Sequence, residues 1–362
     1  MHQIFPLPIC VIIRMILKNG ISFRGLRNLP PWMIKALVFE PLRWVELTFN
    51  RKIKKHKILK DPIFILGFYR SGTSYMHEFL TKDDRFGYHT NFQMILPEIM
   101  LCSEKILSPF FDFICRVFNL QDPVHRIRMS FKFPGEEDGA MTTGFNIRGA
   151  HWGYFFPKIM MSHIQKYIMF DNIKNSEIKG WTNDFVFLLK KISLANKGRQ
   201  LVLKSPPNTT RVKLLLSLFP NAKFIFIHRN PYDVYASNKR FMKLTHKIYA
   251  LGGSKNINTR DIILDTYTQF MRKYLSEKSL IPDRQLIEIR YEDFIKMPME
   301  SMENIYTALS LNEFQHCEKM MIRHMNSRRD YKKLEHKLPS DERSIVTKRL
   351  EPFIKQWNYQ LM

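Results

Sequence analysis

Short apolar runs without polar alternation recur along the chain, and such runs are typical of strands buried on both faces. They lie at residues 63–66, 201–203, 223–227 and 286–289. Each of the first three leads into a helix-like stretch, at residues 73–81, 209–218 and 231–244. This repeated succession of strand and helix predicts an α/β fold with a parallel sheet flanked by helices.

A long insertion lies between the first two predicted strands, and much of it is aromatic and apolar with helical character. Its clearest helical parts are residues 91–100, 106–119 and 181–195. An insertion of this length usually shapes a ligand pocket. Because no repeat and no Gly/Ser-rich linker divides the chain, we expect one domain over residues 61–362, preceded by a helical segment over residues 1–60.

The N-terminal segment combines apolar residues with positive charge, since residues 1–60 hold 12 basic residues and only two acidic ones. Its opening stretch is interrupted by Pro6, Pro8 and Arg14, and it falls short of the ~20 apolar residues that a spanning helix needs. Residues 31–50 have the spacing of an amphipathic helix, and the basic run RKIKKHK follows. Such a segment either touches an anionic membrane surface or, as most amphipathic helices do, simply covers a core.

The whole chain is basic, with 57 Lys and Arg against 33 Asp and Glu and a formal net charge of +24. This excess favours anionic partners such as phosphates, anionic lipid or nucleic acid. A nucleic-acid binder should also carry a recognisable motif, and none is present, so we expect no nucleic-acid partner. The four cysteines are too dispersed for a CxxC pair or a zinc cluster, which favours a reducing, cytoplasmic compartment.

A candidate phosphate-binding loop follows the first predicted strand, where residues 67–74 read GFYRSGTS. Two glycines stand five residues apart before a helix start, so backbone amides and the helix dipole can bind a phosphate or phosphosulfate there. The spacing resembles GxxxxGK[ST], but Thr73 replaces the Lys that reaches the terminal phosphates of a triphosphate. The loop therefore disfavours a kinase and leaves Arg70 as its basic group. The alternative is a glycine turn that only joins strand to helix.

A second basic site is predicted within FIFIHRNPYDVYAS, residues 224–237. Arg229 stands at the carboxyl end of a strand, where ligands of open α/β sheets bind, and Pro231 favours a helix start just after it. Ser237 lies two turns into that helix, so Arg229 and Ser237 can together hold one phosphate. His228 either flanks a nucleotide or, as is commoner for a lone histidine, is structural.

Together, PIFILGFYRSGTS, LVLKSP and FIFIHRNPYDVYAS resemble the sulfotransferase family in its broad bacterial branch, and the segment YEDF at residues 291–294 adds to the resemblance. The resemblance implies a P-loop-like sulfotransferase that uses 3′-phosphoadenosine 5′-phosphosulfate (PAPS). It implies that the 5′-phosphosulfate is held by Arg70, Ser71, Gly72, Thr73 and Ser74, and the 3′-phosphate by Arg229 and Ser237. Arg70 departs from the Lys of the animal cytosolic enzymes. The RKGxxGDWK stretch of those enzymes is also absent, so the cover over the nucleotide must be built differently.

The reaction implied by the resemblance is in-line displacement at sulfur by an acceptor hydroxyl, for which no metal is needed. By analogy with phosphoryl transfer, we expect Arg70 and Lys204 to contact the bridging and sulfuryl oxygens. Lys204 matches a Lys that follows the equivalent strand in the tyrosylprotein branch. The alternative for Lys204 is an ordinary solvated charge at a strand end.

The general base is expected among Glu136, Glu137 and Asp138 in the stretch FPGEEDGA, because clustered carboxylates raise one another's pKa toward neutrality. The alternative is that these three acidic residues simply form the solvated start of a helix, where negative charge is favourable. His89 and His151 are the further candidates.

For the acceptor we expect a small-molecule alcohol that is hydrophobic, such as a lipid or steroid, because the insertion is rich in aromatic residues that suit an apolar pocket. Those residues are Phe110, Phe111, Trp152, Tyr154, Phe155 and Phe156. Such clusters are more often core than pocket, and a carbohydrate acceptor is the nearest alternative. Two other function classes compete, a P-loop kinase and a non-catalytic nucleotide- or polyanion-binding protein.

Overall fold

The computed structural model describes residues 9–122, 128–142, 148–253, 257–311, 313–328 and 338–362. By compactness the chain forms two units, each assembled from separate stretches. Unit 1 comprises Met1–Leu59, Tyr88–Gly198 and Phe241–Ile257, and unit 2 comprises Lys60–Gly87, Arg199–Arg240 and Asn258–Met362. The N-terminal stretch therefore shares a unit with most of the insertion. The expected functional division at residue 60 stays a prediction.

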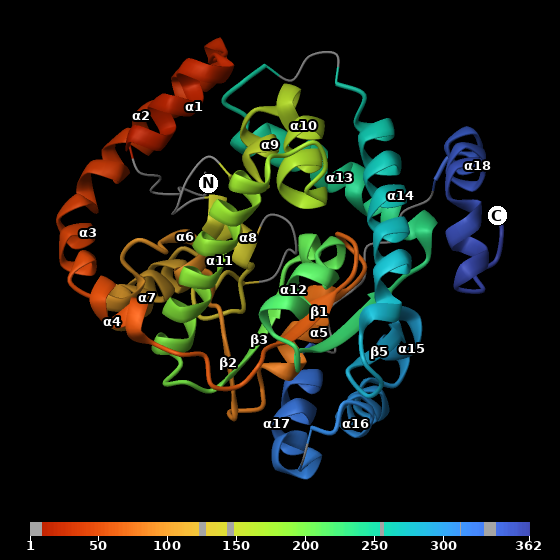
Figure 1. Ribbon diagram of the computed structural model, residues 1–362. Helices are drawn as coiled ribbons and strands as arrows, with labels where there is room; N and C mark the ends of the chain where they lie inside the picture. The colour runs from red at the N-terminus through yellow and green to blue at the C-terminus, as the bar shows by residue number, and fades with distance from the viewer. Residues whose placement is uncertain (1–8, 123–127, 143–147, 254–256, 312, 329–337) are drawn as a thin grey trace. The chain divides into compact units, whose positions relative to one another are not determined.

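Unit 2 is built on a five-stranded parallel sheet with the strand order β2-β3-β1-β4-β5, which confirms the predicted α/β fold (Figure 1). The strands are β1 (Ile63–Leu66), β2 (Phe86–Tyr88), β3 (Gln200–Lys204), β4 (Lys223–His228) and β5 (Leu286–Arg290). Four of them coincide with the predicted apolar runs. β2 was not predicted, because three residues are too few to show a periodic pattern.

Alternate residues of the buried strands point to opposite faces of the sheet, as strand geometry requires. Phe64 packs against Phe219 and Phe224 on one face, and Phe226 stacks on Tyr274 with ring centroids 3.8 Å apart. The helices of unit 2 cover the two faces. They are α5 (Thr73–Leu80), α12 (Val212–Leu218), α13 (Pro231–Tyr249, which passes into unit 1 at residue 241), α14 (Thr259–Glu277), α15 (Tyr291–Lys296), α16 (Pro298–Ala308), α17 (Phe314–Ser327) and α18 (Ser340–Gln356).

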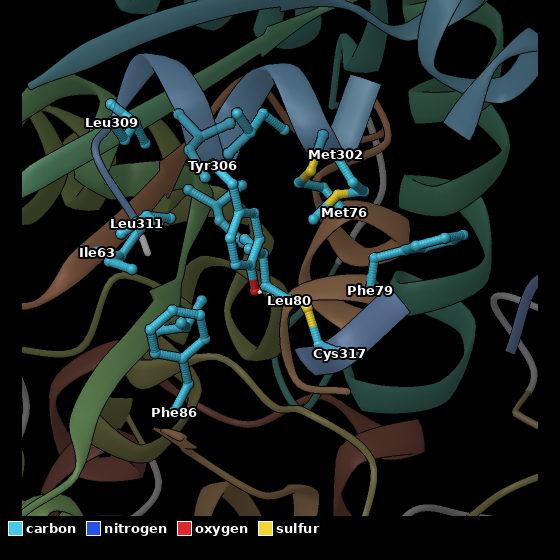
Figure 2. Close-up of a cluster of buried hydrophobic side chains, with 14 of the residues drawn as sticks. Ile63, Met76, Phe79, Leu80, Phe86, Met302, Tyr306, Leu309, Leu311 and Cys317 are labelled. Carbon is cyan, nitrogen blue, oxygen red and sulfur yellow. Dashed lines mark hydrogen bonds between the residues drawn. The ribbon is translucent and has the colours of Figure 1, made fainter. Parts of the chain in front are cut away.

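The other face carries the main core of unit 2, in which Ile63 and Ile65 of β1 pack against helices α5, α16 and α17. Figure 2 shows Tyr306 of α16 reaching into this cluster beside Leu80 and Phe86. The Tyr306 hydroxyl donates to Asp83 Oδ2 at 2.7 Å, so this polar group within the cluster is satisfied. This core fixes α5, and with it the loop that precedes α5.

Unit 1 is helical. Its helices are α1 (Ile9–Asn19), α2 (Phe23–Val38), α3 (Glu40–Leu47), α4 (Asn50–Lys55), α6 (Asn91–Ile95), α7 (Met100–Val117), α8 (Glu137–Ala140), α9 (Trp152–Phe155), α10 (Met160–Ile164) and α11 (Asn175–Ala195). None of the helices in the described residues combines the length and apolar character that crossing a bilayer would require.

A buried ion pair ties the N-terminal helices into unit 1. Lys191 of α11 contacts Glu46 of α3 at 2.7 Å, and both side chains are almost fully buried. Glu46 also accepts hydrogen bonds from the backbone amides of Leu101 and Cys102 at the start of α7, where the helix dipole favours a negative charge. These bonds place α3 beside α7 (Figure 1).

Truncating Phe79 of α5 should destabilise the protein strongly, because its ring is fully buried and packs against Tyr75, Phe294 and His324. We expect Phe79→Ala to lower the free energy of unfolding by about 3–5 kcal/mol, measured by urea denaturation. The half-exposed Leu280 gives the control, since Leu280→Ala should change it by about 0.5 kcal/mol or less. Equal effects of the two variants would contradict the assigned core.

Candidate active site

The loop between β1 and α5 is shaped by close backbone approaches. Gly72 has φ +101°, and a Cβ there would lie 2.2 Å from the ring of Tyr291. A Cβ on Gly67 would lie 2.5 Å from the carbonyl oxygen of Ile227. The Gly67 amide donates to Thr209 Oγ1 at 2.8 Å, which anchors the start of the loop. Only glycine fits these two positions without displacing its neighbours.

Helix α13 holds this loop through polar contacts and brings three of the predicted site residues together. Arg70, at φ +70°, donates from Nε to Ser237 Oγ at 3.1 Å. Arg229 donates from Nη1 to the carbonyl oxygen of Arg70 at 3.1 Å. Asn238 Nδ2 donates to the carbonyl oxygen of Tyr69 at 2.9 Å. Arg70, Arg229 and Ser237 therefore form one cluster that is rich in hydrogen-bond donors.

Arg229 is largely buried, and two neighbours fix its guanidinium. Nη2 donates to Asp233 Oδ2 at 2.9 Å, one helical turn along α13, and the group lies 4.7 Å from the centroid of the Tyr291 ring. The Tyr291 ring thus lies next to Arg229 and also occupies the space that a side chain at position 72 would need. The sequence pointed to Tyr291 only through the YEDF segment, with no individual role.

Lys204 is buried at the end of β3, where only 3% of its surface is exposed, so the alternative of a solvated strand-end charge is wrong. Its Nζ donates to Ser74 Oγ at 3.2 Å, which joins two predicted site residues. In the parallel register, Ile65 of β1 pairs with Lys204 and Leu66 pairs with Phe226 of β4. The carboxyl ends of β1, β3 and β4 therefore bring the loop, Lys204 and Arg229 to the same edge of the sheet.

His228 is a structural residue of the strand end. Its ring stacks on Trp357 with centroids 5.3 Å apart, and its Nδ1 lies 3.0 Å from the hydroxyl of Tyr359. Burial lowers the pKa of His228 to about 4, so the ring is neutral at pH 7. The interpretation of His228 as a packed histidine is therefore the one that the geometry favours.

A C-terminal network supports the start of α13, and the sequence indicated it only through Glu292 of the YEDF segment. Tyr359 donates from its hydroxyl to Glu292 Oε2 at 2.9 Å, and Glu292 Oε1 accepts from the backbone amide of Asn230 at 3.0 Å. The guanidinium of Arg290 lies 4.2 Å from the centroid of the Tyr359 ring. The backbone immediately after Arg229 is thus held by residues more than 60 positions away.

The acidic candidates for the base lie in unit 1, whereas the loop, Lys204, Arg229 and Ser237 lie in unit 2. Glu137 and Asp138 are buried in α8, and Glu136 precedes them as the N-cap residue. The alternative of a fully solvated acidic helix start is therefore wrong for Glu137 and Asp138. Burial, and to a smaller extent the negative charge of Glu136, raises the pKa of Tyr154 well above its ordinary value.

The two histidine candidates border the same segment of unit 1. The backbone amide of Gly135 donates to the carbonyl oxygen of His89 at 2.7 Å. The amide of His151 donates to Thr142 Oγ1 at 3.2 Å, and that hydroxyl donates to the carbonyl oxygen of Asp138 at 2.9 Å. His89 is fully buried, which lowers its pKa to about 3. All the candidate bases thus lie along or next to residues 134–142.

Three of the aromatic residues expected around the acceptor are core residues instead. Trp152, Phe155 and Phe156 are buried against Ile12 and Met15 of α1. Phe110 is more than half exposed, so it lines no enclosed pocket. The pocket inferred from this cluster therefore has no support from these four residues.

Comparison with known proteins gives a consistent result. A model of the sulfotransferase family matches residues 62–316, which is more than half of the chain. A curated relative is the omega-hydroxy-beta-dihydromenaquinone-9 sulfotransferase Stf3 of Mycobacterium bovis. It is 26% identical over 316 residues, which cover 87% of this chain and 80% of the relative, and Stf3 of Mycobacterium tuberculosis matches equally well.

Two solved structures share the fold. Sulfotransferase STF9 from Mycobacterium avium aligns with a TM-score of 0.71 at 16% identity and covers 98% of both chains. Sulfotransferase STF1 from Mycobacterium tuberculosis H37Rv aligns with a TM-score of 0.67 at 17% identity, over 94% of this chain and 90% of its own. With the loop after β1 and the basic strand ends, these matches show that the chain belongs to the sulfotransferase family and is a PAPS-dependent sulfotransferase.

Proposed function

We propose that this sulfotransferase transfers a sulfuryl group to the hydroxyl of a hydrophobic alcohol, with a lipid as the preferred class. The observation that carries the proposal is the match over 87% of the chain to a relative whose name gives a hydroxylated menaquinone lipid as acceptor. A steroid belongs to the same chemical class. A carbohydrate is the contrasting outcome of the test. A lipid acceptor would reside in a bilayer, which would give the expected membrane contact of residues 1–60 a functional reason.

The residues at the carboxyl edge of the sheet suit the anionic groups of PAPS, the sulfuryl donor. Phosphate and sulfate oxygens are acceptors, and the cluster of Arg70, Arg229 and Ser237 offers donors from two cations and a hydroxyl. Gly72 keeps side-chain atoms away from the helix start, where the amides after it can face an anion. We assign the 5′-phosphosulfate to Arg70, Ser71, Gly72, Thr73 and Ser74. We assign the 3′-phosphate to Arg229 and Ser237.

Lys204 and Arg70 are the proposed catalytic cations. When bound, PAPS supplies an activated sulfuryl group, and negative charge grows on the phosphate that leaves. Lys204 is buried beside Ser74, so its charge acts in a medium of low polarity, where it stabilises a neighbouring anion more than it would in water. Ser74 fixes the direction of the Lys204 ammonium group.

For the general base we propose a carboxylate of Glu136, Glu137 or Asp138, with His151 as the alternative. The base takes the acceptor's proton as the new sulfur–oxygen bond forms. His89 is the weaker candidate, because a group whose pKa lies near 3 binds a proton too weakly to collect one at pH 7.

We expect 3′-phosphoadenosine 5′-phosphate to bind in the presence of EDTA, and ATP to bind far less tightly. Arg229→Ala should weaken this binding about tenfold to a hundredfold, because a charge-assisted hydrogen bond is lost, and Ser237→Ala should weaken it less. Isothermal titration calorimetry measures both. Arg349, whose guanidinium pairs with Asp265 on the surface, gives the matched control Arg349→Ala. Unchanged binding by Arg229→Ala would refute the assignment of the 3′-phosphate.

Gly72→Ala should abolish nucleotide binding, because the new methyl group would collide with the Tyr291 ring and the backbone is strained for any L side chain. Gly198→Ala is the matched control, since Gly198 also has positive φ, at +75°, but no atom lies within 4 Å of its added Cβ. We expect Gly198→Ala to bind the nucleotide normally. If both variants bind like the wild type, the loop is not the anion site.

The acceptor is tested by transfer of radiolabelled sulfate to lipid extracts, steroids, phenols and oligosaccharides. We expect labelled lipid or steroid alcohols, and labelling confined to oligosaccharides would refute the lipid proposal while leaving the family assignment intact. Loss of the base by Glu136→Gln, Glu137→Gln or Asp138→Asn should lower the rate about 10²- to 10⁴-fold with nucleotide binding intact.

The pH profile separates the base candidates further. An imidazole with an ordinary pKa loses its base form below about pH 6.5. His89 would keep its base form down to about pH 3, because burial lowers its pKa. Full activity of all three carboxylate variants, with a loss near pH 6.5, would move the base to a histidine of ordinary pKa. A rate that stays flat well below pH 5 in those variants would move it to His89.

A further inference from the structure

Exposed apolar side chains are unevenly distributed in the described part of the chain. Unit 1 carries most of the large apolar side chains that are exposed to solvent. In unit 2 the exposed ones are Leu280, Ile295, Met297, Leu361 and Met362. Scattered single residues of this kind are normal, whereas a concentration marks an interaction surface.

The outer face of α7 carries an unbroken apolar stripe. Ile106, Phe110, Phe113 and Val117 recur at intervals of four, three and four residues, which places them on one side of a helix. Their exposed fractions are 73%, 55%, 59% and 59%. Ser108 and Cys115 on the opposite side of α7 are buried, and Leu107 and Phe111 pack into the apolar cluster around Phe92. Helix α7 is therefore apolar on the side that packs in unit 1, and it also carries a second apolar stripe that faces water.

The N-terminal helices continue this pattern. On α2, Phe23, Leu26, Ile34 and Leu37 are exposed at intervals of three, eight and three residues, and Phe23 is 91% exposed. Among the α2 positions whose burial the structure describes, Gly25 and Ala36 are buried. On α3, which lies beside α7, Trp44 is 71% exposed. Among the residues that the structure describes, one apolar side of each of α2, α3 and α7 is thus left exposed to solvent.

Positive charge accompanies these side chains. In the described part of residues 9–59, the exposed basic residues include Arg14, Lys18, Arg27, Arg51, Lys52, Lys54, Lys55 and Lys57. Glu40 is the exposed acidic residue of α1–α4, and it pairs with Arg43. On α7, the acidic residues Glu104 and Asp112 are engaged by neighbours. Glu104 accepts hydrogen bonds from Thr90 and Gln93, and Asp112 accepts one from the backbone amide of Phe131. The surface therefore combines apolar side chains with a strong excess of cations.

We propose that the exposed apolar sides of α2, α3 and α7, with the basic residues of α1 and α4, bind the surface of an anionic phospholipid bilayer. Apolar and aromatic side chains enter the interface, and Lys and Arg contact the headgroups. A protein partner fits less well, because Lys is depleted in protein–protein interfaces. This inference does not depend on the acceptor, since it rests on side chains outside the candidate active site.

The test is sedimentation of the full-length protein with vesicles of phosphatidylcholine, with and without phosphatidylglycerol. We expect binding to the anionic vesicles and much weaker binding to the neutral ones. Phe110→Ser with Phe113→Ser should lower the partition constant about tenfold for each ring removed. Lys52→Glu with Lys55→Glu should lower it about fivefold or more for each charge, and added salt should mimic this loss.

The matched control is Leu280→Ser with Met297→Ser, because both residues are about half exposed but belong to unit 2. This control should bind vesicles as the wild type does. Nucleotide binding and circular dichroism verify that all variants are folded. Equal loss in the control and the α7 variant would overturn the proposal. So would an α7 variant that binds vesicles normally while losing a dimer that the wild type forms in sedimentation equilibrium.

Trp44 gives a spectroscopic readout of the same contact. Vesicles that contain brominated acyl chains should quench part of the tryptophan fluorescence, because an interfacial Trp44 would approach the bromine atoms. Trp152 and Trp181 are fully buried in unit 1 and should stay unquenched. In a Trp32→Phe background, which removes the tryptophan of α2, Trp44→Phe should remove most of the quenching and retain binding. Quenching that is unchanged in Trp44→Phe would refute the placement of α3 at the bilayer.

Discussion

The placement of β1 between β3 and β4 is the constraint on which the candidate active site depends. In a parallel sheet the carboxyl ends of neighbouring strands meet at one edge. β1 therefore delivers the loop from Gly67 to Ser74 to the same edge as Lys204 and Arg229. The core under α5 holds the helix that begins at the end of this loop. Without this register the cations and the loop amides would not converge.

The cations at this edge are costly to bury, and their partners show how the fold offsets that cost. Arg229 is bound by Asp233, by a backbone carbonyl and by an aromatic ring. Lys204 has a hydroxyl partner in Ser74. These contacts orient the donors before an anion arrives, so less ordering is needed on binding. The same arrangement leaves positive charge in excess, which suits a donor that carries several negative charges.

In unit 1 the N-terminal helices are packed firmly, although some of their apolar side chains remain exposed to water. The buried ion pair of Lys191 and Glu46 attaches α3 to α11. Breaking such a pair would leave an uncompensated charge in the interior. Glu46 also satisfies the amides at the start of α7. One carboxylate therefore fixes both α3 and α7, the two helices whose exposed sides carry Trp44 and the apolar stripe.

The strands with apolar runs, the glycine loop before α5 and the basic residues at the ends of β3 and β4 could be predicted from the sequence, because these features are local. A strand buried on both faces, a glycine pair before a helix and an arginine after a strand each leave a recognisable pattern. Only the tertiary structure decided that Arg70 joins Ser237, that Tyr291 closes on Gly72, and that Tyr359 supports Asn230 through Glu292. It also decided that Trp152 packs in a core while Phe110 faces water. Those outcomes depend on contacts between residues far apart in the chain, and hydrophobicity alone cannot tell a buried aromatic ring from an exposed one.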